Sequence, residues 1–249
     1  MSYTPFDIRV FPIFLYYGII SIFSAILTIK MITKWRERKV NPPLYLSLVF
    51  TFFTAAIAML TVGLAEAVIT GFYMEIYRFS LPFAYSMVIL ADMALFSFVL
   101  ELTDRAKKGI VLVISSGIAI IVMLFLPWNW WGVPPGDYEG LLNIRLYSTL
   151  ALIVYSYIVY IILARICIKS LKKSTDPVAN VGFKFLFAAM ISMILFFLMF
   201  VMDTLMIVLF EHPGYSIFVY IAWIFAIFAL IFMYVSLVMP KWVLKRINK

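Results

Sequence analysis

The chain has 249 residues, of which 65% are hydrophobic and 13% charged, and its formal net charge is +8. The apolar residues form seven long runs, and no gap between them approaches the roughly 100 residues that a soluble domain needs. This organisation excludes a kinase, cyclase or nucleotidase domain within the chain. It predicts an all-α, polytopic membrane protein whose residues 1–249 form a single seven-helix transmembrane domain.

Each apolar run is predicted to form one transmembrane helix. Most runs exceed the about 20 residues that cross a bilayer, and none has the two-residue alternation of a membrane β-barrel. The first run is expected to be retained, because the amino terminus lacks the basic segment and the cleavage site of a signal peptide. In chain order the predicted spans are Val10 to Ile32, Leu44 to Gly71, Leu81 to Thr103, Ile110 to Leu126, Leu146 to Ile168, Phe185 to Phe210 and Tyr215 to Met239.

The basic residues divide unequally between the two ends of these spans. Of the 20 Lys and Arg residues, only Arg9, Arg78 and Arg145 belong to one side. The remainder lie in alternate gaps and in the tail: Lys30, Lys34, Arg36, Arg38 and Lys39; Arg105, Lys107 and Lys108; Arg165, Lys169, Lys172, Lys173 and Lys184; Lys241, Lys245, Arg246 and Lys249. By the positive-inside rule, this crowded side is cytoplasmic. We therefore expect an external amino terminus and a cytoplasmic carboxyl terminus, in the plasma membrane.

The same asymmetry accounts for the positive net charge. Basic residues at the ends of spans face anionic lipid headgroups, so membrane lipids are the expected partners of this surface. A basic ring of this kind does not indicate nucleic acid.

Acidic residues within the spans are the most informative polar groups, because an ionised carboxylate in hydrocarbon is costly unless it is paired, hydrated or protonated. They are Glu66, Asp92, Glu101 and Asp203. Asp92 lies about eleven residues into its span, or roughly 16 Å along the helix, which places it near the middle of the bilayer. Tyr85 lies on the same face of that helix, within about 20°.

These acids have both functional and structural interpretations. Glu101 is expected to form an interfacial ion pair with Arg105, four residues later. We hypothesise that Glu66, Asp92 and Asp203 converge in the outer half of the bundle, near Tyr85, and bind a proton, a cation or an amine. The alternative is that they hold neighbouring helices together by hydrogen bonds.

The longest gap, Pro127 to Arg145, is a second candidate site. As the one long external segment, it could act as a lid or contact a ligand through Trp130, Asp137, Glu139 and Arg145. The alternative is that its tryptophans form an aromatic belt at the membrane interface.

Catalytic and cofactor chemistry has few candidates. His212 is the only histidine and belongs to an external turn, so neither a metal site nor any other cofactor is predicted. No Gly-x-Ser-x-Gly or His-Glu-x-x-His motif occurs, and we expect no enzymatic activity. Seven helices with an external amino terminus resemble rhodopsins, but the span Tyr215 to Met239 has no lysine to bind retinal.

Three short stretches carry a resemblance to another family. They are GLAEA from Gly63 to Ala67, FSFVLELTDR from Phe96 to Arg105, and KKSTDP from Lys172 to Pro177, which precedes a span with Asp203 near its end. In these stretches and in layout the chain resembles the amino-terminal seven-helix sensor region of membrane histidine kinases. The resemblance implies a region that detects an extracellular or membrane-borne stimulus and passes it through its last helix to a cytoplasmic transmitter.

The chain departs from that family after Met239, because only about ten residues follow and they hold no transmitter. It is expected to be either a receptor that acts with a separate cytoplasmic partner or the receptor portion of a longer protein. A small cation- or proton-coupled transporter or channel, and a structural membrane assembly partner, are the alternative functions.

Overall fold

The computed structural model describes residues 3–103, 109–210 and 215–240. Three predictions fall outside these residues: the pairing of Glu101 with Arg105, the turn position of His212, and the placement of the basic residues 105–108 and 241–249.

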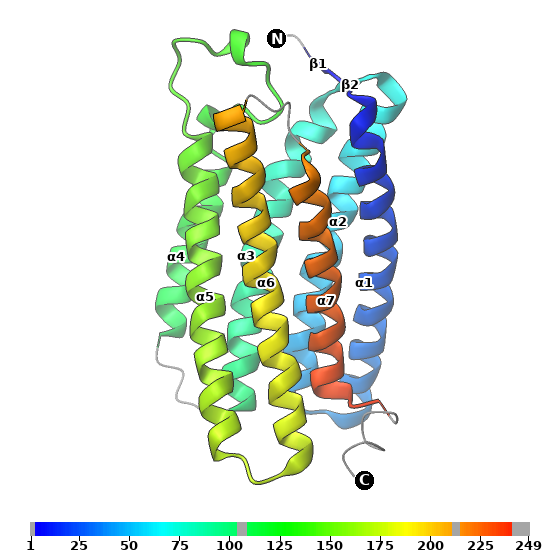
Figure 1. Ribbon diagram of the computed structural model, residues 1–249, viewed down its shortest axis with the longest axis vertical. Helices are drawn as coiled ribbons and strands as arrows, with labels where there is room; N and C mark the ends of the chain where they lie inside the picture. Colours follow the sequence, from blue (N-terminus) through cyan, green and yellow to red (C-terminus); the bar gives the residue numbers. More distant parts are fainter. Residues whose placement is uncertain (1–2, 104–108, 211–214, 241–249) are drawn as a thin grey trace. The chain divides into compact units, whose positions relative to one another are not determined.

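The described chain is all-α apart from one pair of two-residue strands. Six helices in its described part are long and apolar enough to cross a membrane, so the chain is an integral multi-pass membrane protein. Figure 1 labels the elements: β1 (Thr4–Pro5), α1 (Phe11–Arg38), α2 (Asn41–Thr70), β2 (Phe72–Tyr73), α3 (Glu75–Leu102), α4 (Ile110–Leu124), α5 (Arg145–Lys173), α6 (Pro177–Phe210) and α7 (Ile217–Val238). Short 3-10 turns cover Ile8–Val10, Pro127–Asn129 and Pro135–Asp137.

Several helices run beyond the apolar residues that predicted them. α6 begins at Pro177, eight residues before the predicted start at Phe185. The carboxylate of Asp176 accepts hydrogen bonds from the backbone N–H groups of Val178 and Ala179, both at 3.1 Å, and so caps the first turn. Proline fits this first helical position because its missing N–H would have no partner within the helix.

The shortest of these helices, α4, has 15 residues and a length of about 22 Å. It runs antiparallel to α3, because Gly117 lies against Ile89 and Met93, whereas the ring of Phe125 lies 6.3 Å from that of Phe79. α4 therefore lies alongside more than ten residues of α3. Its length is below the about 30 Å of a typical hydrocarbon core, unlike those of the other six helices.

Contacts divide the chain into two units. Unit 1 comprises residues 1–97 and 106–156, and unit 2 comprises residues 98–105 and 157–249. The helices α3 and α5 contribute residues to both units.

Close helix contacts in unit 1 involve small and hydroxyl-bearing residues. The hydroxyl of Thr54 in α2 donates to that of Ser24 in α1 at 3.0 Å, and lies 3.3 Å from the hydroxyl of Thr28. A Cβ atom added to Gly63 in α2 would lie only 2.5 Å from Oγ of Ser80 in α3. Such contacts are typical of membrane helices, where small residues permit close packing and hydroxyls bond across helices.

One end of unit 1 carries two further structures. At this end β1 pairs with β2 in antiparallel register, and residues 125–144 form the long loop after α4 (Figure 1). We call this end of unit 1 the loop end.

Aromatic contacts join the helices of unit 2. The indole of Trp223 in α7 meets the rings of Phe196 and Phe200 in α6 edge-on, with centroids 5.4 and 6.2 Å apart. The ring of Phe197 lies 6.0 Å from that of Tyr160 in α5. Edge-to-face pairs of this kind stabilise a bundle beyond the area that they bury.

Candidate functional site

A buried hydrogen bond joins α3 to α5 within unit 1. The hydroxyl of Ser156 donates to Oδ2 of Asp92 at 2.7 Å, and both side chains have an exposed fraction of 0%. Beside this pair, the phenol of Tyr155 donates to the carbonyl oxygen of Val113 in α4 at 3.1 Å. A Cβ atom on Gly117 would lie 3.0 Å from that phenol oxygen, so Gly117 leaves the room that Tyr155 occupies.

This arrangement gives Asp92 a polar environment inside an apolar bundle. A carboxylate can accept several hydrogen bonds, whereas a protonated carboxyl group also donates one. A change of protonation or of helix spacing would therefore change the bond with Ser156. The geometry fits both a functional acid and a hydrogen bond that holds α3 against α5.

Tyr85 lies seven residues before Asp92, or about 10 Å nearer the loop end along α3. Its ring meets the indole of Trp131 edge-on, with centroids 5.5 Å apart and an interplanar angle of 71°. The structure thus links Tyr85 to the loop, and its predicted participation in an acidic site remains a prediction.

Glu66 binds the backbone at the start of α3. Its carboxylate oxygens accept hydrogen bonds from the N–H groups of Ile76 at 3.2 Å and Tyr77 at 2.9 Å. A carboxylate at this position satisfies free amides and interacts favourably with the helix dipole. Tyr77 precedes Asp92 by 15 residues, about 22 Å of helix, so the structure does not bring Glu66 and Asp92 together.

Asp203 has a similar bond within unit 2. Its Oδ1 accepts a hydrogen bond from the backbone N–H of Ser216 at 2.8 Å. The hydroxyl of Ser216 in turn accepts from the N–H of Phe218 at 3.4 Å and caps α7. Asp203 therefore ties the end of α6 to the start of α7, and its convergence with the acids of unit 1 stays a prediction.

Two adjacent tryptophans of the loop have different partners. The indole of Trp130 stacks on Tyr138 at 5.9 Å, and its N–H donates to the carbonyl of Leu142 at 2.8 Å. The indole N–H of Trp131 donates to the carbonyl of Leu124 at 3.0 Å. Between these two sets of contacts the backbone turns, and Trp130 itself has a positive φ of 48°. Trp130 thus stabilises the loop itself, whereas Trp131 contacts the helices.

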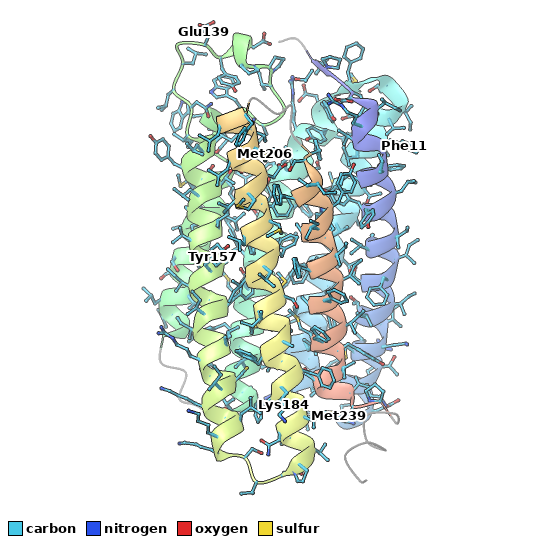
Figure 2. All side chains as sticks on the ribbon, viewed as in Figure 1. Phe11, Glu139, Tyr157, Lys184, Met206 and Met239 are labelled. Atoms are coloured by element: carbon cyan, nitrogen blue, oxygen red, sulfur yellow. The ribbon has the colours of Figure 1, made fainter. Side chains whose placement is uncertain are left out.

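The other predicted loop residues also separate. The guanidinium carbon of Arg145 lies 5.8 Å from the centre of the Trp131 ring, in a cation–π contact. Asp137 and Glu139 are exposed, and Figure 2 shows Glu139 at the outer edge of the loop, away from the helices. Of these residues, Arg145 is thus connected to Tyr85, through the shared contact with Trp131.

Charged and aromatic side chains also fasten the amino terminus at the loop end. Arg78, in α3, forms an ion pair with Glu75 at 3.1 Å and lies 4.8 Å from the ring of Tyr3. The guanidinium of Arg9, which donates hydrogen bonds to Asp7 at 2.9 and 3.1 Å, holds the pKa of that carboxyl below its usual value.

Two residues of this site were missed by sequence reasoning. Ser156 resembles any small polar residue in an apolar helix, but it lies ten residues into its predicted span, close to the depth of Asp92 in another span of the same direction. Their equal depth in the membrane is the signal from which a contact between Ser156 and Asp92 could have been predicted. Trp131 could not be distinguished from its two neighbouring tryptophans, because only the loop backbone determines which indole faces α3.

Within the described residues, no group of three or more His, Cys, Asp or Glu side chains could hold a metal ion. Comparison of the chain with protein-family models, with curated proteins and with solved structures gave no match.

Proposed function

We propose that the chain is a non-enzymatic sensor module of the plasma membrane, with seven spans, an external amino terminus and a cytoplasmic carboxyl terminus. It detects an extracellular or membrane-borne stimulus and signals to a cytoplasmic partner. The observation that carries this proposal is the buried hydrogen bond between Asp92 and Ser156, because it joins two helices at a group whose bonding can change.

The path of α4 supports a seventh span. α4 runs antiparallel to α3, and the chain returns by it to the loop end of unit 1, where α5 begins. If α3 crosses the membrane, α4 must cross it as well. A short apolar helix can do so where the bilayer thins or flanking residues reach the interface.

The partners of the arginines support an external loop end. The three arginines of this end each interact with an acidic or aromatic side chain: Arg9 with Asp7, Arg78 with Glu75, and Arg145 with Trp131. Five further cations cluster at the opposite end of α1, from Lys30 to Lys39. That distribution favours a cytoplasmic position for the α1–α2 turn.

In this proposal, the stimulus selects between two packings of α3 and α5. Both helices begin in unit 1 and continue into unit 2, so a shift of their outer halves in unit 1 would be passed along each helix to its residues in unit 2. The resemblance to sensor regions of histidine kinases is consistent with such a role. The signalling partner would bind at the basic cytoplasmic face.

A structural assembly partner is the second candidate. It is favoured by the bonds of Glu66 and Asp203, which both accept from backbone N–H groups and thereby fix helix ends. A cation- or proton-coupled transporter would instead use Asp92 as its binding site.

Two measurements separate these functions. In the first, purified protein in liposomes is assayed for proton and sodium flux; a sensor gives no saturable flux, and saturable flux that is lost in Asp92→Asn indicates a transporter. In the second, spin labels are placed at Glu139→Cys and Thr175→Cys in a Cys167→Ser background. A sensor has two populated label-to-label distances whose ratio changes in Ser156→Ala, whereas one unchanged distance favours the structural role.

A further inference from the structure

The outer halves of α3 and α5 in unit 1 form a seam with two levels. On α3, Tyr85 and Asp92 are seven residues apart, and on α5, Arg145 and Ser156 are eleven residues apart. At 100° per residue, each pair lies within about 20° on one helix face. Tyr85 and Arg145 therefore mark the upper level of the seam, near the loop end, and the hydrogen bond between Asp92 and Ser156 marks its lower level.

The indole of Trp131 connects the two helices at the upper level. It contacts the ring of Tyr85 at 5.5 Å and the guanidinium of Arg145 at 5.8 Å, and its N–H is held by the carbonyl of Leu124 at 3.0 Å. One side chain of the loop thus contacts α3, α5 and the end of α4. Trp131 is only partly exposed, in contrast to Trp128 in the same loop, which is 44% exposed.

The backbone next to Trp131 is also held against α3. Gly132 has a φ of +65°, a conformation that glycine adopts without strain, and a Cβ atom there would lie 2.9 Å from Cγ of Arg78. At the root of the loop, the side-chain amide of Asn129 donates to the carbonyls of Met123, Leu124 and Leu126. Its oxygen accepts a hydrogen bond from Ser148 in α5. The root is therefore fixed, and Trp131 is held at a defined position over the seam.

From this geometry we infer that Trp131 is a plug: it closes the loop end of the α3–α5 seam and limits the access of water and small polar solutes to Asp92 and Ser156. The plug opens when the indole leaves Tyr85 and Arg145. This inference deepens the proposed function by naming the residue that regulates its site. In the alternative, structural role, Trp131 only anchors the loop at the membrane interface, as tryptophans commonly do.

Thiol labelling distinguishes the two roles. In a Cys167→Ser background, Ser156→Cys is exposed to a small, charged, membrane-impermeant methanethiosulfonate, and the labelling rate is measured with and without Trp131→Ala. A plug predicts that Trp131→Ala raises the rate about tenfold, the size expected for loss of one aromatic and one cation–π contact. The matched control is Trp128→Ala, which removes an exposed tryptophan of the same loop and should leave the rate unchanged.

The inference would be overturned if Trp131→Ala and Trp128→Ala gave equal labelling rates. It would also be overturned if the protein that keeps Trp131 were labelled as fast as Trp131→Ala. If Ser156→Cys fails to fold, Val88→Cys, one turn from Asp92 on α3, serves as the reporter with the same expected outcomes. A loop reporter, Glu139→Cys, is labelled in parallel from outside. Labelling of Glu139→Cys without any effect of Trp131→Ala would reject the plug while leaving the external orientation intact, and absence of that labelling would reject the orientation itself.

Discussion

The hydroxyl of Ser156 donates a hydrogen bond to the carboxylate of Asp92 across the α3–α5 contact, with both side chains fully buried. Hydrogen bonds between membrane helices typically contribute about 0.5–2 kcal/mol. Ser156→Ala removes the donor and leaves a buried acceptor with one bond fewer, so we expect it to lower the melting temperature in detergent by roughly 2–6 °C.

The matched control for Ser156→Ala is Ser115→Ala in α4. The Ser115 side chain is exposed and its hydroxyl bonds to the carbonyl of Leu112 in its own helix, so this change should be nearly neutral. If both variants melt at the temperature of the unmodified protein, the bond between Ser156 and Asp92 does not stabilise the fold.

Glu66 provides a test of structural against ligand-binding roles for an acid. Glu66→Ala removes the acceptor for the N–H groups of Ile76 and Tyr77 and should cost about 0.5–2 kcal/mol, as loss of a helix cap does. Glu66→Gln keeps an oxygen that can accept and should recover much of the stability, which thermal melting would measure. A Gln variant as unstable as the Ala variant would show instead that the negative charge itself is required.

Gly63 is expected to tolerate no side chain. A Cβ atom there would lie 2.5 Å from Oγ and 2.9 Å from Cβ of Ser80, so Gly63→Ala must displace α3 and should cost roughly 1–3 kcal/mol. The control is Gly18→Ala in α1, where no atom lies within 4 Å of the added carbon. Because alanine favours helix more than glycine, Gly18→Ala should be neutral or stabilising. Equal melting temperatures for the two variants would contradict the close approach of α2 and α3.

The helical class was predictable because an apolar run of this length can satisfy its backbone hydrogen bonds in lipid by few structures other than a helix. The ends of the helices were less predictable. Backbone hydrogen bonding continues past the last apolar residue wherever a cap is available, as Asp176 shows for α6. The length of α4 was also overestimated, since apolar character extends to Leu126 although the helix ends at Leu124.

The candidate site was predictable in part. Asp92 was identified from its depth, and the structure buries it. Its bond with Ser156 depends on which faces of α3 and α5 meet, and a single sequence does not contain that information. Glu66 was assigned to the same site, but the short α2–α3 connection turns the start of α3 toward it, and the carboxylate binds the amides there.

The orientation in the membrane is the claim on which the external site and its plug both depend. Single cysteines at Glu139 in the loop and at Thr175 in the α5–α6 turn, each exposed, are introduced into a Cys167→Ser background. Intact cells are then treated with a membrane-impermeant maleimide. The account predicts labelling of Glu139→Cys at once and of Thr175→Cys only after the cells are permeabilised; the reverse pattern would contradict it.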